Sequence, residues 1–363
     1  MKPAFSFYDL YGEIGAFFNT FIKTSDIFVA NNDSMIEDQS VREKLLAITE
    51  STEIEGAELI QSLWSNYGQL LRVFLTGGSD RSVIVKHIKL PDNQAHPRGW
   101  NTDASHQRKL RSYEIETAWY EGLAQQTDQS CKVPDLLGTW QEGGERILVL
   151  EDLDLAGFPV RKQQASIAEM KACLSWLANF HAKYMNQKAP GLWNKGSYWH
   201  LDTRQDEWHA MTNQPLKDAA RAIDKRLDEV TYKTVIHGDA KLANFCFSTD
   251  GLQVAAVDFQ YVGPGCGMKD VAYFLSSCLH EDDLEVYADD LLAYYFELLE
   301  ISLIRLPQDI DIKLVINEWT QLYAYAWADF YRFLDGWSPG HWKIHGYSKR
   351  MTDRVLNDPK QRI

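Results

Sequence analysis

The chain has 363 residues, with 37 Lys and Arg against 51 Asp and Glu, which gives a formal net charge of −14. An acidic chain repels polyphosphate backbones, so general nucleic-acid binding is not expected. Hydrophobic residues make up 45% of the sequence, enough for a sizeable core, and at about 150 residues per domain the length suggests two domains or lobes. No apolar run reaches the ~18 residues that a membrane span needs. The first residues also lack the basic start and apolar stretch of a signal peptide.

The five cysteines are scattered, odd in number and never arranged as CxxC; they are Cys131, Cys173, Cys246, Cys266 and Cys278. This pattern argues against a disulfide framework and against a cysteine-rich zinc site. We therefore expect reduced thiols and a cytoplasmic location. The sequence leaves the oligomeric state open.

The first 153 residues are predicted to be rich in strands. Residues 1–50 are expected to form a helical extension, and residues 51–153 a lobe built on a sheet with one helix over 112–125. Strands alternate with glycine-containing turns and are expected at 59–64, 69–75, 82–90, 136–140 and 146–150.

A polar segment over residues 91–111 is predicted to be a loop, and it is basic although the chain is acidic. Its basic residues are His96, Arg98, His106, Arg108, Lys109 and Arg111. A solvated surface loop is the simplest interpretation. Contact with an anionic substrate or with phosphate is the alternative.

Residues 154–363 are predicted to form a larger, mostly helical lobe. Apolar residues at helical spacing indicate an amphipathic helix near 167–184, and long helices are expected over 281–304 and 311–335. One hairpin over 244–258 interrupts them. A β-rich part followed by an α-rich part predicts an α+β chain rather than the regular alternation of a doubly wound sheet.

The sharpest motif is His-Gly-Asp-Ala-Lys-Leu-Ala-Asn, which runs from His237 to Asn244 and is followed fourteen residues later by Asp258-Phe-Gln. The intervening residues read as a hairpin with a two-residue turn at 250–251. That turn would place Asn244 almost opposite Asp258, close enough to share one Mg²⁺ through oxygen ligands. Asp239, in the loop entering the hairpin, is left to act on a substrate.

This arrangement matches the template for phosphoryl transfer, in which one Asp accepts the hydroxyl proton while an Asn and a second Asp hold the metal. A buried polar turn, with Asp239 capping a helix, is the structural alternative. Upstream, the strand ending at Lys86 resembles the kinase strand whose lysine holds the ATP phosphates. Glu116, on the helix over 112–125, is the carboxylate we expect to pair with Lys86.

Two further segments are expected to contact ATP. The buried strand over 146–150 leads into a connector whose Leu150, Glu151 and Leu153 would face adenine, with backbone groups of Glu151 and Leu153 binding it. The loop over 62–68 would cover the phosphates through Ser62, Ser65 and Gly68. It contains one glycine and lacks the G-x-G-x-x-G pattern, so its phosphate contacts would come mainly from serine hydroxyls.

These motifs resemble the aminoglycoside phosphotransferase/choline kinase superfamily, and most of all its ecdysteroid-kinase-like (CHK kinase-like) branch with its bacterial relatives. The resemblance rests on the segments starting at His237 and Asp258, on Leu148–Leu153, on Leu177–Ala182, on Tyr113–Glu116 with Tyr120, and on Asp270 in its Lys-Asp-Val-Ala-Tyr context. It covers roughly residues 55–280, while 1–50 and the last eighty residues match only loosely.

The resemblance implies a bilobal protein-kinase-like fold and phosphorylation of a small-molecule hydroxyl by Mg-ATP. Asp239 would be the catalytic base, with Lys241 either at the γ-phosphate or a solvated loop lysine. Asn244 and Asp258 would hold Mg²⁺. Lys86 and Glu116 would position the phosphates, and Asp270 would hold the catalytic loop or cap its helix.

The acceptor itself stays open. Aromatic residues in the stretch 190–211 (Trp193, Tyr198, Trp199 and Trp208) are candidates for a pocket wall, and with Asp202, Asp206 and Glu207 they would suit an apolar alcohol or a cationic amine. A helical aromatic stripe over 323–333 is expected to be core. Three other interpretations remain: a nucleotide-binding module without turnover, a protein kinase, and an antibiotic-modifying kinase.

Overall fold

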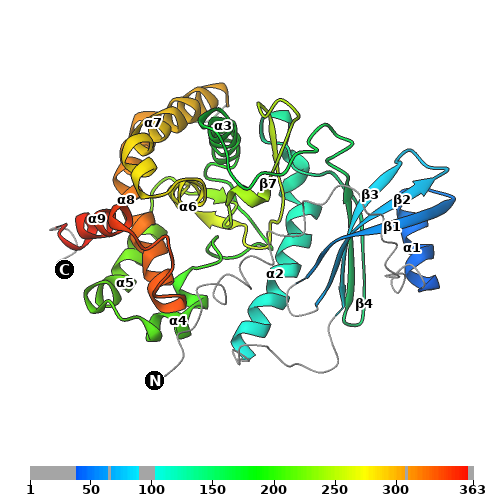
Figure 1. The fold of residues 1–363 in the computed structure, drawn as a ribbon, viewed down its shortest axis with the longest axis horizontal. Coiled ribbons are helices and arrows are strands. Elements are labelled where there is room, and N and C mark those ends of the chain that lie inside the picture. The colour runs from blue at the N-terminus through cyan, green and yellow to red at the C-terminus, as the bar shows by residue number, and fades with distance from the viewer. Residues whose placement is uncertain (1–37, 64–66, 90–102, 307–309, 359–363) are drawn as a thin grey trace, which may run out of the picture.

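The computed structural model describes residues 38–63, 67–89, 103–306 and 310–358. A sheet-containing part and a larger helical part lie side by side in Figure 1, with the sheet on the right. The predicted helical extension up to residue 37, Trp64 and Ser65, and the part of the basic segment from 91 to 102 lie outside the described residues.

The sheet is antiparallel and has the strand order β1-β2-β3-β5-β4. Its strands are β1 (Glu53–Ser62), β2 (Gly68–Thr76), β3 (Ser82–Lys89), β4 (Leu136–Glu142) and β5 (Glu145–Glu151). All five lie where the sequence predicts strands. The first begins earlier than the expected 59, because its N-terminal half is charged and largely exposed and so carries little hydrophobic signal.

Alternating side chains of β3 and β5 face two different cores. Val85 and Val149 pack with Val41 and Leu45 of α1 (Gln39–Thr49), on one face of the sheet. Leu148 and Leu150 point to the other face and join the main core of the helical part. Lys86 follows Val85, so the period of two in a strand turns its side chain toward that second face.

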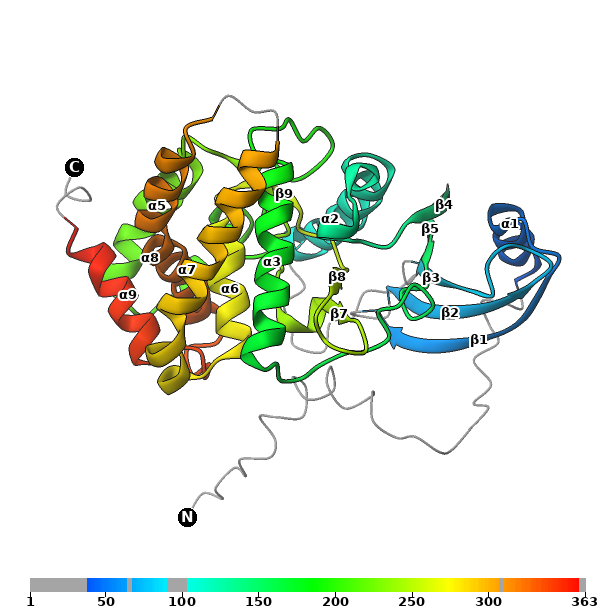
Figure 2. The same cartoon turned by 90° about the horizontal axis from the view of Figure 1, so that it is seen from above.

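The helix α2 (Asp103–Glu121) lies between the sheet and the helical part (Figures 1 and 2). It starts earlier than expected: residues 103–111 were predicted as loop and are helical. Residues 103–111 are mostly polar and show no apolar residues at helical spacing, so the sequence pattern did not predict a helix there. The helix is held here by polar contacts, such as the Ser112 hydroxyl that donates to the Lys109 carbonyl at 2.7 Å.

The helical part is built on long helices, among them the predicted amphipathic helix and the two predicted long ones. They are α3 (Ile167–Lys183), α4 (Gln205–Ala210), α5 (Gln214–Asp228), α6 (Met268–Cys278), α7 (Glu281–Arg305), α8 (Ile312–Trp337) and α9 (Gly346–Leu356). Figure 2 shows α3 and α7 side by side. Within the described part of the chain, no helix is long and apolar enough to cross a membrane.

Two short strand pairs lie between the helices and the sheet. The hairpin of β7 (Phe245–Phe247) and β8 (Val254–Ala256) has the predicted register, with Phe245 opposite Ala256. The last backbone pairing before the loop joins Ser248 to Gln253, so residues 249–252 form the loop, where a two-residue turn at 250–251 was expected. The Asp250 carboxylate holds this longer loop by accepting from the Ser248 hydroxyl and the Leu252 N–H. The second pair joins β6 (Thr234–Ile236) to β9 (Gly263–Gly265).

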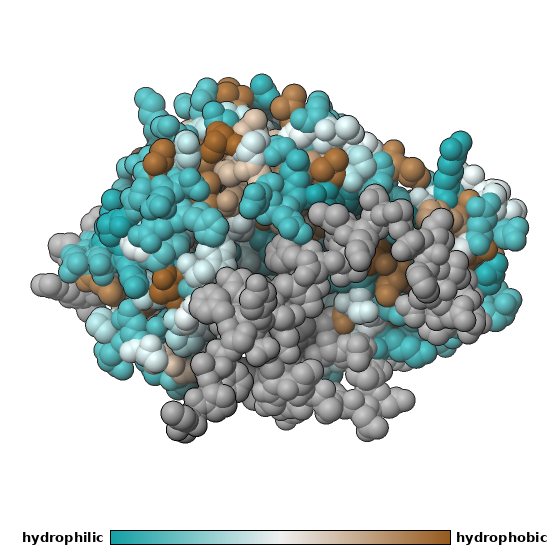
Figure 3. Space-filling model, viewed as in Figure 1, coloured by the Kyte–Doolittle hydropathy of each residue, from teal (hydrophilic) through white to brown (hydrophobic). Residues whose placement is uncertain are grey.

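All five cysteines are free thiols, and four of them are buried. The surface in Figure 3 is mostly hydrophilic, with apolar residues scattered singly over the face shown. Such scattered residues are ordinary for a protein surface.

Candidate active site

The predicted catalytic loop leaves β6 at His237 in a tightly fixed conformation. The Asp239 N–H donates to His237 Nδ1 at 3.2 Å, so Nε2 carries the ring proton and donates to the Val257 carbonyl at 3.0 Å. Gly238 has a φ of +78°, and a Cβ there would lie 2.1 Å from the Tyr261 carbonyl oxygen. The backbone therefore requires the glycine of the His-Gly-Asp motif independently of any chemistry.

Asp270, in the first turn of α6, fixes the backbone of this loop through hydrogen bonds to its side chain. Its carboxylate accepts the His237 N–H at 2.6 Å and the Gly238 N–H at 2.9 Å. His181 Nε2 lies 3.2 Å from the same carboxylate, and its Nδ1 lies 2.8 Å from the Tyr295 hydroxyl. The side chains of His181 and Asp270 are fully buried. Asp270 thus lies in the position expected of a residue that holds the loop.

Asp239 lies between a lysine and an amide. Lys241 Nζ is 3.1 Å from Asp239 Oδ2. The Asn244 side-chain NH₂ donates to the same Oδ2 at 3.1 Å and to the Asp239 carbonyl at 2.8 Å. Burial lowers the pKa of Lys241, but the carboxylates of Asp239 and Asp258 outweigh it and raise that pKa overall. The loop therefore holds an anion with a cation directly beside it.

Asp258 follows β8 and faces the opening of the hairpin. The Val257 N–H donates to the Asn244 carbonyl at 3.0 Å, so the two predicted metal ligands are neighbours across the hairpin. Asp258 has a φ of +68°, an uncommon conformation for a residue other than glycine, and its side chain is 36% exposed. Burial raises its pKa, and the nearby ammonium groups, led by Lys86, lower it by more. Asp258 is therefore ionised at neutral pH.

The oxygen atoms of this pair fit a Mg²⁺ ion. Because the Asn244 nitrogen faces Asp239, its oxygen Oδ1 lies on the opposite side of the amide and remains a potential ligand. Mg²⁺ is commonly bound by one or two protein oxygens together with phosphate oxygens and water. Among the described residues, no group of three or more His, Cys, Asp or Glu side chains could hold a metal. A two-ligand site completed by phosphate is what this donor set suits.

Lys86 and Glu116 form a buried ion pair. Lys86 Nζ lies 2.6 Å from Glu116 Oε2 and 3.5 Å from Asp258 Oδ1. Burial lowers the pKa of Lys86, but the two carboxylates outweigh it and raise that pKa overall. The lysine is therefore held charged, and it links β3, α2 and Asp258 at one point.

The connector between the two parts contains the predicted adenine-facing residues. Leu150 and Leu153 are buried. The Glu151 N–H donates to the Asp135 carbonyl at 2.9 Å, and its carboxylate lies 2.6 Å from Lys132 Nζ. The Glu151 N–H therefore already has an acceptor within the chain. Of the Glu151 backbone groups predicted to bind adenine, only the carbonyl remains a candidate.

The predicted covering loop is described only at its ends. Ser62 is exposed at the end of β1, and Ser65 lies outside the described residues. Gly68 has a φ of +139°, and a Cβ there would lie 1.9 Å from the His87 carbonyl oxygen. The close approach of β2 to β3 thus explains this glycine without any ligand.

The aromatic residues of 190–211 do not form one pocket wall as predicted. Trp199 is fully buried, and its Nε1 donates to Asp329 at 3.0 Å. Trp208 Nε1 donates to the Lys217 carbonyl at 3.2 Å, away from the catalytic loop. Tyr198 does reach the site, since its N–H donates to the Gly238 carbonyl at 3.0 Å. The helical stripe over 323–333 is buried, as expected.

Two lysines near Asp239 are missing from the predicted site. Lys109 Nζ donates to Gln260 Oε1 at 2.8 Å and interacts electrostatically with Asp258 and Asp239. Lys109 precedes Glu116 by seven residues, two helical turns, so a helix prediction for this segment would have placed both on one face. Lys343 interacts electrostatically with Lys241 and Asp239. It lies in the poorly matching C-terminal region, and no sequence signal identifies it.

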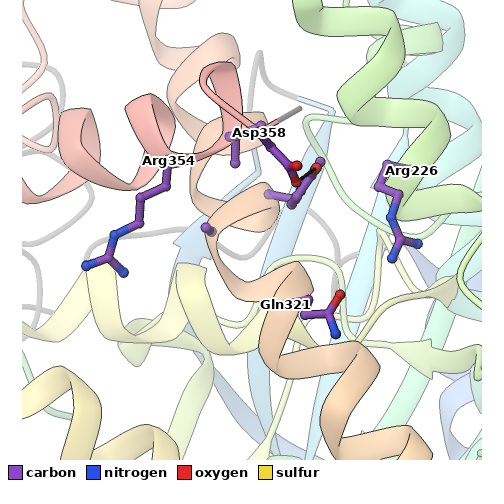
Figure 4. Close-up of a pocket in the computed structure, with 7 residues that line it drawn as sticks. Arg226, Gln321, Arg354 and Asp358 are labelled. Carbon is purple, nitrogen blue, oxygen red and sulfur yellow. Dashed lines mark hydrogen bonds between the residues drawn. The ribbon is translucent and has the colours of Figure 1, made fainter. Parts of the chain in front are cut away.

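A surface pocket of about 220 Å³ lies elsewhere, between α5, α8 and α9. Figure 4 shows Arg226 and Arg354 on either side of Asp358, with their guanidinium groups pointing away from each other. The Tyr325 hydroxyl donates to Asp358 at 2.9 Å. None of the residues lining this pocket belongs to the catalytic loop, so it is not part of the candidate active site.

Comparisons with known proteins agree with the motifs. The model of a family described as "APH: Phosphotransferase enzyme family" matches residues 60–304, about two thirds of the chain. No curated protein matches. Among solved structures, the chain is similar to a microcompartment-associated aminopropanol kinase, with 14% identity, a TM-score of 0.48, and 88% of this chain and 93% of that chain covered.

Two further solved structures are similar at the same low level. Choline kinase LicA from Streptococcus pneumoniae has 14% identity and a TM-score of 0.44, with 88% of this chain and 98% of that chain covered. An ethanolamine kinase from Plasmodium vivax has 10% identity and a TM-score of 0.45, with 100% and 98% covered. At these identities and TM-scores, the substrates of these proteins do not indicate the substrate of this chain.

Proposed function

The chain belongs to the phosphotransferase enzyme family, and we propose that it is a kinase that transfers the γ-phosphate of ATP to a hydroxyl group of a small molecule. Its antiparallel five-stranded sheet followed by a helical part is the protein-kinase-like fold that the sequence predicts. The observation that carries the proposal is the convergence of Lys86, Asp239, Asn244 and Asp258 from three segments on one site.

In this proposal Asp239 orients the acceptor hydroxyl and accepts its proton during transfer. Lys241, 3.1 Å from the Asp239 carboxylate, is close enough to contact the phosphoryl group that approaches the hydroxyl. Asp270 keeps Asp239 in place through the backbone of the loop. The reaction then needs the acceptor oxygen in line with the γ-phosphorus and the leaving oxygen of ATP, with Asp239 at the acceptor hydroxyl. In such a transfer, positioning provides much of the rate enhancement.

On the nucleotide side, Lys86 would donate to the phosphates, with Glu116 fixing its direction. Asn244 and Asp258 are the residues that would hold Mg²⁺, which neutralises phosphate charge when bound. Leu150 and Leu153, with the Glu151 carbonyl, would face adenine. Ser62, Ser65 and Gly68 remain candidates for the loop over the phosphates.

A small acceptor fits better than a peptide. In this chain the segment after Asp258 returns at once, because β9 pairs with β6 over Gly263–Gly265. Helix α6 then begins at Met268. The long loop that would present a peptide substrate in a protein kinase therefore has no space between Asp258 and α6.

The free thiols support our proposal that the reaction is cytoplasmic, and the motifs support our proposal that the chain belongs to the ecdysteroid-kinase-like branch.

The test is phosphate transfer from radiolabelled ATP with Mg²⁺ to a library of small hydroxyl compounds and, in parallel, to a peptide library. Transfer to a small compound, absent in the Asp239→Asn variant, is the expected result. Binding of Mg-ATP with no transfer to any compound would favour a module without turnover. Transfer to peptides would favour a protein kinase.

A further inference from the structure

Basic side chains gather near the catalytic loop in a chain whose net charge is −14. We call this group the basic rim; it consists of Arg108, Lys109, Arg204, Lys241 and Lys343. Lys241 contacts Asp239 directly, and Lys109 and Lys343 interact with it electrostatically. Arg204 is joined to the site through its Nε, which donates to the Tyr198 carbonyl at 2.7 Å.

Three members of the basic rim have neutral partners in the described part of the chain. Lys343 Nζ lies 3.4 Å from the Ser276 hydroxyl, and Lys109 donates to Gln260. Arg108 donates to the Thr203 carbonyl at 2.7 Å and to the Ser105 hydroxyl at 3.2 Å. A partly buried cation without a carboxylate beside it is costly, and a bound anion compensates for this cost.

Lys343 is the member best placed to meet an acceptor. It comes from the segment between α8 and α9, and its Nζ lies 4.9 Å from the centre of the Tyr273 ring and 5.4 Å from that of Phe330. The Tyr273 hydroxyl lies next to Asp239 and Tyr198. The side chain is half-buried, and burial lowers its pKa to about 7. A bound anion would raise this pKa again and hold the lysine in its charged form. An acceptor held at Lys343 would present its hydroxyl toward Asp239.

The acidic residues nearby do not supply a site for a cationic acceptor. Glu207 is buried and pairs with Arg204 at 3.0 Å. Asp202 pairs with Lys195 at 3.2 Å, and Asp206 is exposed. The Asp239 carboxylate at the centre of the rim is already paired with Lys241 at 3.1 Å, so an ammonium group placed beside Lys343 would meet that lysine without a carboxylate of its own. Three of the four aromatic rings that were expected to hold a cation already have one of the protein's own cations beside them. Arg204 lies 5.4 Å from the Tyr198 ring centre, Lys269 5.4 Å from that of Trp199 and Arg221 4.8 Å from that of Trp208.

We propose that the acceptor is an anion, a small hydroxyl compound that carries a carboxylate or a phosphate group, and that Lys343 binds this group while Asp239 receives the hydroxyl. The inference rests on the proposed function, because it assigns a substrate class to the same site. It takes Lys343 as an acceptor-binding residue and leaves Lys86 with its carboxylates to the nucleotide.

Four probes that share one benzylic hydroxyl and differ in charge test this. They are 3-(hydroxymethyl)benzoate, 3-(hydroxymethyl)phenyl phosphate, 3-methylbenzyl alcohol and 3-(hydroxymethyl)benzylamine. Their binding is measured by calorimetry on the full chain saturated with Mg²⁺ and a non-hydrolysable ATP analogue. At least one anionic probe is expected to bind about tenfold or more tightly than the neutral probe, the scale of one charge-assisted hydrogen bond. The carboxylate and phosphate arms show which anion is preferred.

Three variants separate acceptor binding from other effects. Lys343→Met should remove the preference for the anionic probe, Lys343→Arg should keep it, and Lys349→Met, at an exposed lysine of α9, should leave it unchanged. The analogue itself should bind all variants equally. Equal or weaker binding of the anionic probes, or no binding of any probe, would overturn the inference, as would a Lys343→Met variant that loses the analogue. If the wild type does not bind the analogue, the proposed function fails first.

Discussion

Lys86 of β3 and Glu116 of α2 form an ion pair with their charged atoms 2.6 Å apart, across thirty residues of chain. Both side chains are less than a tenth exposed. The pair connects the sheet to α2 and holds the ammonium group 3.5 Å from Asp258 Oδ1. The Lys86 ammonium group thus links the sheet, α2 and the residue that follows the β7–β8 hairpin through two contacts.

The first prediction concerns the stability that this pair provides. Removing one partner leaves the other charge buried, so Lys86→Met and Glu116→Gln should each lower the free energy of unfolding by about 3–5 kcal/mol. The double variant should lose less than the sum, with a coupling of about 1–3 kcal/mol. Urea denaturation of the three variants and the wild type measures this. Additive losses would mean that the two residues do not stabilise the fold as a pair.

The second prediction separates chemistry from nucleotide binding. Asp239→Asn removes the proton acceptor and keeps the shape of the side chain, so kcat should fall about 10²- to 10⁴-fold. The affinity for Mg-ATP should stay within about twofold, because Asp239 is not among the proposed nucleotide ligands. Asp250→Asn, at the exposed tip of the hairpin, is the matched control. A variant at Asp239 with nearly normal kcat would exclude it as the base.

The third prediction concerns the support of the catalytic loop. Asp270→Ala leaves the buried N–H groups of His237 and Gly238 without their acceptor, which should cost about 1–3 kcal/mol for each group in the free energy of unfolding. Asp270→Asn keeps one acceptor oxygen and should cost less. Both variants should lower kcat more than they raise the KM for ATP. Asp283→Asn, exposed in the first turn of α7, should change neither quantity.

The fourth prediction is a pH dependence from Lys109. Burial, followed by the nearby Lys86 ammonium, lowers its pKa to about 8 in the folded chain, whereas an unfolded lysine titrates near about 10.4. Between pH 8 and about pH 10, Lys109 is protonated to a greater extent in the unfolded state than in the folded state. The free energy of unfolding of the wild type therefore increases with pH over this range, because the cost of burying a charged lysine is lost. The stability of Lys109→Met relative to wild type should therefore decrease from pH 8 to about pH 10.

Melting temperatures of Lys109→Met and wild type across this pH range check the fourth prediction. The Lys349→Met variant is the control, because it alters an exposed lysine and should follow the wild type at each pH. A constant difference between Lys109→Met and wild type would show that Lys109 is not held in the desolvated position that the structure gives it.

Much of the fold follows from local patterns in the sequence. The strands β2 to β5 are short, largely apolar segments, and Gly77-Gly78 and Gly143-Gly144 mark the turns between β2 and β3 and between β4 and β5. Helix α3 has a clear apolar period with a capping box at Ser166 and Glu169. The start of α2 could not be predicted in this way. Its first two turns are held by tertiary contacts, such as that from Lys109 to Gln260, which no local pattern records.

The candidate site divides in the same way. The loop from His237 to Asn244 and the hairpin to Asp258 are contiguous, so spacing alone predicts the register that the structure shows. Pairing of Lys86 with Glu116 was predictable from strand and helix order. Lys343 approaches from the end of α8, about a hundred residues after Asp239. Only the packing of α6 against α8 brings it to the site.

The most direct test of the kinase account is thermal stabilisation by ATP with and without Mg²⁺, on the wild type and on Asp258→Ala. Ligand at one hundred times its Kd adds about 2.7 kcal/mol to the stability of the folded state, a visible shift in Tm. The account predicts a clear increase in Tm for the wild type only when ATP and Mg²⁺ are both present, and little or no increase for Asp258→Ala. An unchanged Tm for the wild type, or equal increases for both proteins, would contradict it.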